Sequence, residues 1–468
     1  MDNYEEDQEY LRELLERFES VSGEGGYSFF DSGELEDIIY YYFSEAELVK
    51  AQKAIDYAME QFPAEVSFQV FKAQYFLNNG EPEKALARLN SLEAVDPQNP
   101  DISLTRATVY SSMHKHAEAI KEYQKSLAKV DEDLDEIHTS IAFEYQNLRD
   151  YKNAAEHLKK AIRLNKENES LLYEIGYCYE MGQMSEEAIA FFTSEIDTRP
   201  YSLVAWYNLG IAYSTLELYE KAIDGFDYSI AIDPTFTPAY FSKAQCYEQM
   251  EMYQEAINVY KQTFELEKPD SMTNYYIGDC YASMEKYETA IEFYRKSISL
   301  ERHFSDAWMG IGLCFVELEQ YSEALSHIEQ AIKIESDNAE YYIVLAETQL
   351  ALGLDDEAAL AYEKASELEP YHAEIWLDYS DFYAEIKKDF SKALEILENG
   401  IYYQGENSAL AYRRIAYLYE SGKHKEAVLE LFIALTMDYE AHVQLLEYSE
   451  KARNSTEILA VIASCKNQ

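Results

Sequence analysis

The sequence predicts an all-α solenoid of about twelve stacked helical hairpins, each about 34 residues long. Two series of small residues support this prediction, because both recur at a constant spacing of 34 residues. The first series is Gly176, Gly210, Ala244, Gly278, Gly312 and Ala346, and the second is Ala188, Ala222, Ala256, Ala290, Ala324 and Ala358. A helix–turn–helix unit of this size cannot bury its apolar face alone, so neighbouring units must stack on one another.

The unit 203–236 illustrates how each hairpin is encoded. Apolar residues recur at helical spacing on both sides of a polar break near Glu217. Gly210 and Ala222 are expected to be small because the two helices cross closely there. Pro234 ends the second helix, since proline lacks an amide hydrogen and clashes with the preceding turn.

The motif of this unit closely resembles the tetratricopeptide repeat (TPR). The family's W-x-x-L-G-x-x-Y, A-x-x-x-F and P pattern is matched by Trp206, Leu209, Gly210, Tyr213, Ala222, Phe226 and Pro234. Aligned on the two series, the repeats begin near residues 32, 66, 100, 135, 169, 203, 237, 271, 305, 339, 373 and 408. The resemblance implies a right-handed superhelical array of these repeats with capping helices at its ends.

Two places depart from the period. The unit from residue 100 is one residue longer, because an acidic run over 131–136 stretches its link. The phase slips again near Lys387, and the stretch 399–407 replaces the proline expected there. These slips are expected to mark bends between parts of the array.

The two ends of the chain are expected to cover the array, because open solenoid ends need caps. Residues 1–20 predict an acidic amphipathic helix whose apolar stripe is Tyr4, Leu11, Leu14, Leu15 and Phe18. A flexible link follows at Ser22, Gly23, Gly25 and Gly26, and this arm either caps the first repeat or acts as a removable plug. The predicted division is an acidic helix with its link (1–31), the TPR array (32–439) and a final pair of capping helices (440–468).

The formal net charge is −49 at pH 7, and the first 65 residues carry 18 acidic and four basic side chains. Nucleic acids and anionic lipids are poor candidates as partners, because binding them requires clustered Lys and Arg. The acidity either keeps an extended array soluble or attracts a basic partner. No apolar stretch reaches the roughly 20 residues of a membrane span, and no secretory signal is recognisable. We therefore expect a cytoplasmic protein that does not insert into membranes.

No catalytic or phosphate-binding motif is recognisable, so we expect neither enzyme activity nor a cofactor. Cys178, Cys246, Cys280 and Cys314 share one repeat position, two residues after the small residue of the first helix. Stacked repeats would place them roughly 10 Å apart, too far for one zinc ion, whose thiolate bonds are about 2.3 Å long. They are expected to be buried core thiols rather than metal ligands.

The TPR resemblance implies that repeat positions 5, 9 and 12 of each first helix face a concave groove. Position 5 is aromatic in four consecutive units, and these rings could alternatively serve packing between repeats. The predicted partner-binding residues are Phe143, Tyr173, Tyr177, Glu180, Tyr207, Asn208, Phe241, Glu248, Tyr275 and Asp279. Rings stack on cations and carboxylates attract them, so the groove is expected to bind a basic or aromatic-rich, extended segment of another protein.

The sequence therefore predicts a non-catalytic protein-interaction scaffold or adaptor. Two alternatives stay open: an assembly chaperone that shields a basic client, and a regulatory subunit of an enzyme complex. Self-association through the terminal repeats is also open.

Overall fold

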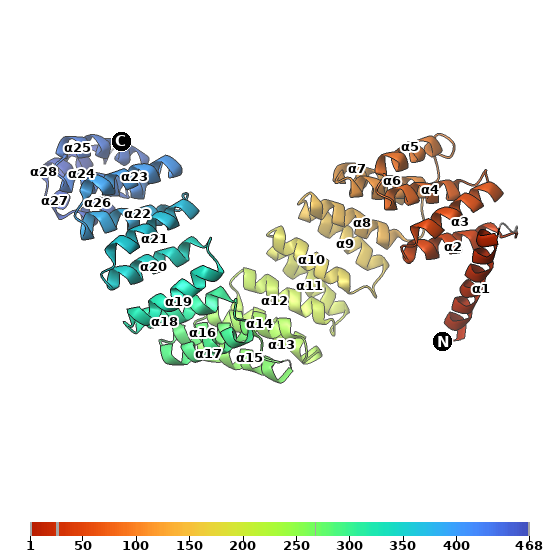
Figure 1. Ribbon diagram of the computed structural model, residues 1–468, viewed down its shortest axis with the longest axis horizontal. Helices are drawn as coiled ribbons and strands as arrows, with labels where there is room; N and C mark the ends of the chain where they lie inside the picture. The colour runs from red at the N-terminus through yellow and green to blue at the C-terminus, as the bar shows by residue number, and fades with distance from the viewer. Residues whose placement is uncertain (1, 25–27, 267, 467–468) are drawn as a thin grey trace. The chain divides into compact units, whose positions relative to one another are not determined.

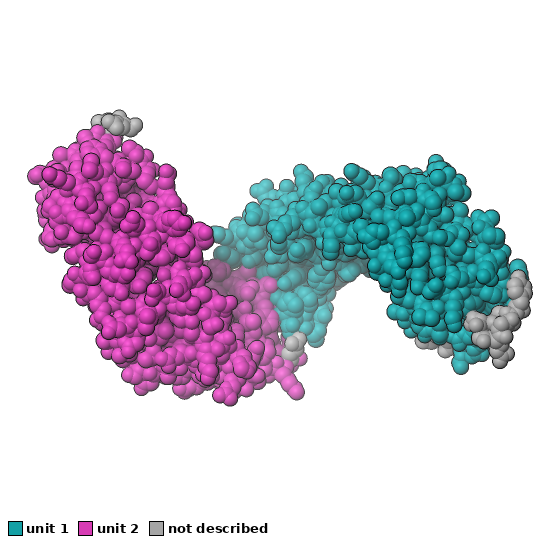
Figure 2. Space-filling model, turned by 45° about the horizontal axis from the view of Figure 1, so that its top comes forward, with its two compact units in different colours: residues 1–239 teal, residues 240–468 magenta. Residues whose placement is uncertain are grey.

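The computed structural model describes residues 2–24, 28–266 and 268–466, and the side chains of 2–8 and 21–24 are not among the described parts. These residues form 28 α-helices and one short π-helix, with no strand among them (Figure 1). The all-α repeat array predicted from the sequence is confirmed. The chain forms two compact units, residues 1–239 and 240–468 (Figure 2).

Twelve helical hairpins follow one another in the described chain, at the predicted repeat starts. The first six are α2 (Ser32–Ser44) with α3 (Leu48–Gln61), α4 (Val66–Asn78) with α5 (Pro82–Glu93), α6 (Pro100–Ser112) with α7 (His116–Leu127), α8 (Leu134–Asn147) with α9 (Tyr151–Leu164), α10 (Ser170–Met181) with α11 (Ser185–Thr198), and α12 (Leu203–Thr215) with α13 (Tyr219–Ile232). The next six are α14 (Thr237–Gln249) with α15 (Tyr253–Leu266), α16 (Ser271–Ser283) with α17 (Tyr287–Leu300), α18 (Ser305–Glu317) with α19 (Tyr321–Ile334), α20 (Ala339–Ala351) with α21 (Asp355–Leu368), α22 (Ala373–Asp381) and the π-helix η1 (Phe382–Ile386) with α23 (Phe390–Gln404), and α24 (Ser408–Glu420) with α25 (His424–Met437).

Several first helices begin at a side chain that caps the free amide groups of the first turn. Asp31, Ser202, Asp270, Asn338 and Asn407 each accept a hydrogen bond from a backbone N–H two or three residues later. Such caps satisfy amide groups that have no partner inside the helix. They fix where a hairpin begins, and therefore the register of the small residues that follow.

Each first helix is followed by a residue with positive φ, at the same place in all twelve hairpins. These residues are Ala46, Gly80, His114, Arg149, Gln183, Glu217, Glu251, Glu285, Glu319, Gly353, Lys388 and Gly422, with φ between 54° and 86°. At Glu217 the turn is a Schellman motif: its N–H donates to Ser214 O, and the N–H of Leu218 donates to Tyr213 O, both at 2.9 Å. The left-handed residue ends the helix and directs the chain back along it.

The spacing of these left-handed residues is 34 everywhere except at two 35-residue steps, from His114 to Arg149 and from Gly353 to Lys388. These are the two slips predicted from the sequence. At the second, η1 accommodates the additional residue, because a π-turn contains one residue more than an α-turn.

The small residues permit close crossing of the two helices in a hairpin, as predicted. A Cβ atom built on Gly210 would lie 2.6 Å from the ring of Phe226, and one on Gly278 would lie 2.7 Å from the ring of Tyr294. Ala222 and Ala290, at the second repeated position, are completely buried. Side chains larger than these would push the paired helices apart.

The N-terminal helix α1 (Asp2–Glu24) continues through Ser22 and Gly23, where a flexible link was predicted, so that prediction was wrong. A single glycine inside a helix costs only about 1 kcal/mol, which its neighbours can offset. Leu14 and Phe18 are 2 % exposed and pack on the first hairpin. The described part of α1 therefore covers apolar side chains of the first hairpin. The side chain of Tyr4 and the residues Gly25 and Gly26 lie outside the described parts.

At the other end, the described residues form three helices rather than the predicted pair: α26 (His442–Tyr448), α27 (Glu450–Arg453) and α28 (Thr456–Cys465). Ile458 and Ile462 are buried in the core of the last hairpins. Val443 on α26 and Leu459 on α28 are exposed. The additional break falls at Ser449, whose hydroxyl accepts a hydrogen bond from the N–H of Ala452 and so caps α27.

The four cysteines of the repeated position are buried, as predicted. Burial raises the pKa of the Cys178 thiol to about 11 and that of Cys314 to about 12, so both are protonated near neutral pH. In the described chain, no helix combines the length and apolar character that crossing a bilayer requires. Nor do three or more His, Cys, Asp or Glu side chains gather there in a way that could hold a metal ion.

Candidate partner-binding surfaces

A cavity of about 560 Å³ opens on the first helices of three consecutive hairpins in the second unit. Its lining comes from α16, α17, α18 and α20. The residues are Tyr275, Asp279, Ala282, Ser283, Tyr287, Tyr294, Asp306, Met309, Gly310, Leu313, Cys314, Glu317, Glu340 and Tyr341. Tyr275, Asp279 and Ala282 are positions 5, 9 and 12 of their repeat, so the expected groove positions do line a hollow in this hairpin. We call it the acidic cavity.

Tyrosine hydroxyls hold two of its carboxylates in place. The hydroxyl of Tyr294 donates to Asp279 Oδ1 at 2.6 Å, and that of Tyr341 donates to Asp306 Oδ1 at 2.5 Å. A hydroxyl donor satisfies one lone pair of a carboxylate but leaves its negative charge uncompensated. The tyrosines therefore orient the carboxylates without neutralising them.

No Lys or Arg is among the described residues that line the acidic cavity. Among the residues that the structure describes, no ion pair includes Asp279, Asp306, Glu317 or Glu340. Burial, and then the charges of Glu248 and Asp306, raise the pKa of Asp279 to about 6, although hydrogen bonds from Tyr294 and Tyr275 act in the opposite direction. A carboxyl group so perturbed by burial and by like charge is often found at a functional site.

The other predicted residues of the second unit are partly buried. Phe241 packs against Tyr260, with ring centroids 5.7 Å apart, and burial raises the pKa of the Glu248 carboxyl, which accepts a hydrogen bond from Cys280 Sγ at 3.2 Å. Tyr275 contacts Phe304 at a centroid distance of 5.0 Å while it lines the cavity. Packing and exposure to the cavity are therefore combined in one ring.

In the first unit the predicted rings are more open. Phe143 on α8 and Tyr173 and Tyr177 on α10 are 42 %, 41 % and 46 % exposed, and Glu180 is exposed as well. Tyr207 on α12 is partly buried, because its ring packs edge-on against Phe236 at 5.2 Å. We call Phe143, Tyr173, Tyr177 and Glu180 the ring surface.

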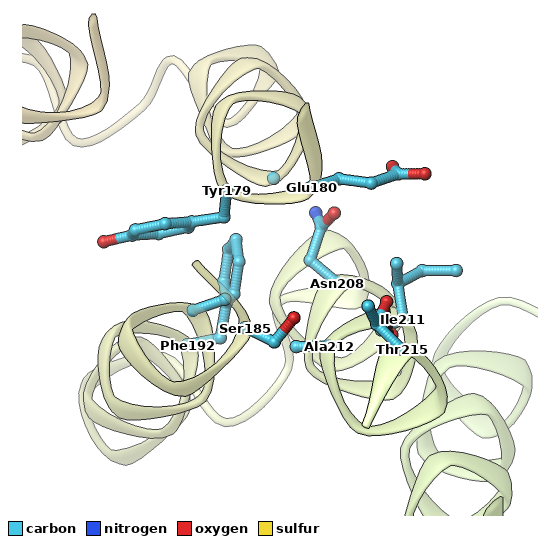
Figure 3. A pocket seen from close by; sticks show the side chains of 10 residues that line it. Tyr179, Glu180, Ser185, Phe192, Asn208, Ile211, Ala212 and Thr215 are labelled. Carbon is cyan, nitrogen blue, oxygen red and sulfur yellow. Dashed lines mark hydrogen bonds between the residues drawn. The ribbon is translucent and has the colours of Figure 1, made fainter. Parts of the chain in front are cut away.

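Asn208 does not present its amide to a groove. Figure 3 shows it rising from α12 towards α10, while Glu180 points away from it. Its side-chain nitrogen donates to Val204 O at 2.9 Å and to Leu172 O at 3.4 Å, and the residue is 8 % exposed. A Cβ on Gly176 would lie 2.0 Å from Asn208 Oδ1, so the glycine makes room for this amide. Asn208 joins neighbouring hairpins, and we exclude it from the binding surface.

Most residues that line the acidic cavity lie outside repeat positions 5, 9 and 12. Asp306 and Glu340 both occupy repeat position 2, 34 residues apart, and this recurrence was visible in the sequence. Tyr294 stands at position 24, where Phe192 and Phe226 stand in earlier repeats. Tyr260 already stands at this position in the repeat before, and in the acidic cavity the hydroxyl of Tyr294 donates to Asp279.

Comparison with protein families gives matches along most of the array. Models described as tetratricopeptide repeat match residues 71–133, 141–202, 203–236, 237–270 and 309–373, together more than half of the chain. A model described as anaphase-promoting complex, cyclosome, subunit 3 matches residues 263–331. A comparison with curated protein sequences gave no match.

Solved structures of similar fold include other helical-repeat proteins. Yeast Tom70 is 14 % identical, with 92 % of this chain and 94 % of that chain covered and a TM-score of 0.43. The Cut9–Hcn1 hetero-tetramer of the APC/C gives 13 % identity, 82 % and 96 % coverage and a TM-score of 0.39. YrrB, a TPR protein with an unusual peptide-binding site, gives 20 % identity, 39 % and 93 % coverage and a TM-score of 0.32.

Proposed function

Because the chain belongs to the tetratricopeptide repeat family, whose repeats indicate a protein-interaction scaffold, we propose that its acidic cavity binds a Lys- or Arg-bearing segment of a partner protein. The segment would enter between α16, α18 and α20 in an extended form. The scaffold itself would not be catalytic, as is typical of the family. The partner would be a protein rather than nucleic acid.

One observation carries this proposal: Asp279, Asp306, Glu317 and Glu340 surround one cavity in which no described cation pairs with them. Four tyrosine rings line the same space, and an aromatic face attracts a cation that lies within about 6 Å of its centre. An incoming guanidinium or ammonium group would find carboxylate oxygens and ring faces together. A carboxylate-bearing ligand would be repelled.

The ring surface of the first unit belongs to the same proposal as a second place of contact. Its three exposed rings offer contact area at low entropic cost, and Glu180 adds a charge of the same sign as the acidic cavity. An aromatic-rich or basic part of the same partner would suit it.

Binding of a labelled Arg/Gly-repeat peptide, measured by fluorescence anisotropy, tests the proposal. Replacing Asp279→Asn and Asp306→Asn together should raise the Kd at least about tenfold, because both removed charges face the ligand. The matched control removes two exposed carboxylates from second helices of the same unit, Glu292→Gln with Glu329→Gln, and should change the Kd less than about twofold. Equal losses in the two variants would mean that only overall charge matters.

A second candidate, a subunit of a larger protein complex, is favoured by the match over residues 263–331 to a model named for subunit 3 of the anaphase-promoting complex. These residues include α16, α17 and α18, which form most of the acidic cavity. If the chain is such a subunit, native size-exclusion chromatography of an extract should place it well above the 54.3 kDa of the single chain. Elution at the mass of one chain would contradict this candidate.

The division into 1–31, 32–439 and 440–468, the cytoplasmic location and self-association through terminal repeats stay predictions. The assembly-chaperone alternative shares the acidic cavity with the first candidate. A chaperone would release its client on transfer to nucleic acid, which a stable adaptor would not do. A competition with duplex DNA against a bound basic partner therefore separates the two.

A further inference from the structure

An apolar groove near the end of the array lies outside the acidic cavity. It has a volume of about 510 Å³ and is formed by α23, α24 and α25. Its apolar lining comprises Ile401, Ala411, Ile415, Ile433, Ala434 and Met437. We call it the C-terminal groove.

The outer face of α25 continues this apolar surface. Leu429 and Ile433 are 67 % and 62 % exposed, and Met437 follows at the same spacing of four residues. Residues spaced by four lie on one face of a helix. By comparison, α17 and α21 each expose one large apolar side chain, Leu300 and Leu360 respectively. An apolar stripe beside an apolar groove is unusual for solvent-facing surface and typical of a binding site.

The capping helices of this chain pack elsewhere. α26 contacts α24 and α28 contacts α25, with Leu445 and Ile458 fully buried. The lining of the C-terminal groove, as far as the chain is described, includes no residue of α26, α27 or α28. The groove therefore lies on a side of the last hairpin that the caps leave uncovered.

Carboxylates predominate around the groove. Glu406 and Glu430 are in its lining together with Arg414, which pairs with Glu430 at 2.8 Å. Burial raises the pKa of Glu430, Arg414 acts against this, and the nearby charges of Glu426 and Glu398 raise it further. This negative excess repels an acidic helix or an anionic membrane, and it complements Lys or Arg placed beside an apolar stripe.

We propose that the C-terminal groove docks an amphipathic α-helix of another protein whose apolar stripe is flanked by Lys or Arg. The helix lays its apolar residues, spaced by three and four, against Leu429, Ile433 and the groove floor at Ile415. Its basic residues reach Glu406 and Glu430 at the edge. The partner differs in chemistry from the charged, extended segment of the acidic cavity, so the two sites can be occupied independently.

The test uses the full chain and a fluorescein-labelled Leu/Lys peptide of about 18 residues, patterned as an amphipathic helix about 27 Å long. A peptide of the same composition with its stripe scrambled, and one with Glu in place of Lys, serve as probes of pattern and charge. Measurements at about 0.3 M NaCl suppress attraction by distant surface charge. The patterned Leu/Lys peptide should bind at least about tenfold more tightly than either of the other two.

Ile433→Asp should weaken that binding at least about tenfold, because it places a buried charge in the middle of the interface. Leu360→Asp removes an equally exposed apolar side chain on α21 and should change the Kd less than about twofold. Leu429→Asp provides a second groove variant, and melting curves establish that all three variants are folded.

Three results would overturn the proposal. One is equal binding of the patterned peptide by the Ile433→Asp and unaltered chains. Another is a dimer of the unaltered chain in sedimentation that Ile433→Asp abolishes, which would make a second copy the occupant. The third is co-sedimentation with neutral phosphatidylcholine vesicles that the same change abolishes, which would make the groove a lipid contact.

Discussion

Tyr173 in the first unit and Tyr275 in the second occupy the same repeat position and have different surroundings. Tyr275 is covered by Phe304, which stands at position 34 of its own repeat, and Phe236 covers Tyr207 in the same way. In the repeat of Tyr173, position 34 is Ser202, whose side chain has no aromatic ring that could cover Tyr173. The repeat position therefore sets the face on which a residue lies, and at Tyr275 and Tyr207 a ring at the end of the repeat covers it further.

The comparison extends to charge. Around Tyr275 the next two repeats contribute Asp306 and Glu340 at position 2, and Tyr294 contributes a hydroxyl that holds Asp279. In the ring surface, by contrast, Phe143, Tyr173 and Tyr177 are exposed, and Glu180 is the one acidic residue among its members. One repeat pattern has thus produced an exposed aromatic patch in one unit and an open acidic cavity in the other.

Two helix-crossing glycines, one in each unit, should give the largest effects. Gly278→Ala and Gly210→Ala each place a Cβ less than 3 Å from a buried ring, Tyr294 and Phe226 respectively, and should each lower the free energy of unfolding by about 2 to 3 kcal/mol. Only Gly278→Ala should also weaken binding of the basic peptide, since displaced Tyr294 no longer holds Asp279. Urea titration and anisotropy measure the two effects. Loss of peptide binding in Gly210→Ala as well would remove the distinction between the regions.

Truncating the two tyrosines compares their packing directly. Tyr275→Ala should cost about 2 kcal/mol of unfolding free energy, because its ring contacts both Tyr294 and Phe304. Tyr173→Ala should cost less than about 0.5 kcal/mol, because this side chain is 41 % exposed and lies at the surface. Thermal and urea unfolding of both variants check the difference. Similar losses would show that the exposed ring is as much a part of the core as the covered one.

The pH dependence of stability should distinguish the regions next. The pKa of Asp279 is raised from 3.8 to about 6 in the folded chain, so its stabilising contribution is complete below about pH 4 and is lost as the pH rises through 6. Asp279→Asn should therefore flatten the fall in unfolding free energy between pH 4 and 7 by about 1 to 2 kcal/mol, less than the full shift because water screens a partly exposed group. Glu180→Gln, at an exposed carboxyl of the ring surface, serves as the control. An unchanged profile in Asp279→Asn would argue against its burial among like charges.

The smallest effect should be common to both regions. Glu217 and Glu285 hold left-handed conformations, which cost an L-residue about 1 to 2 kcal/mol. Replacing either with Gly should raise the unfolding free energy by about 0.5 kcal/mol, because the flexibility of glycine in the unfolded chain offsets part of the gain. Equal gains at the two sites would show that the turn is equivalent in both units. A loss at either site would mean that the glutamate makes a contact worth more than the strain.

The repeat starts could be predicted because close helix crossing demands a small residue, and that demand is local in sequence. Gly210, Gly278 and Ala290 therefore mark their hairpins even where the intervening residues differ. The left-handed turns were not predicted, since Glu285 has no intrinsic preference for positive φ and the Schellman hydrogen bonds impose it.

The binding surfaces were predicted less well than the fold. Position 5 identified Tyr275 and Tyr173, but their exposure depends on Phe304 and Ser202, at the far end of the repeat. Asn208 was predicted to be a partner-binding residue, because nothing in its own helix indicates that Leu172 O accepts a hydrogen bond from its amide. Contacts between residues far apart in the sequence decide these cases, within one repeat for Tyr275 and between two repeats for Asn208.

Four buried thiols lie one to a repeat, on α10, α14, α16 and α18. A thiol that is sequestered in this way escapes alkylation until its own hairpin opens, and repeat proteins open piecewise. With the partly exposed Cys465 replaced by Ser, the order in which an alkylating reagent modifies the remaining four would rank the lifetimes of those hairpins. The rate at which each buried thiol is alkylated would thus report how often its hairpin opens, next to the ring surface at Cys178 and next to the acidic cavity at Cys314.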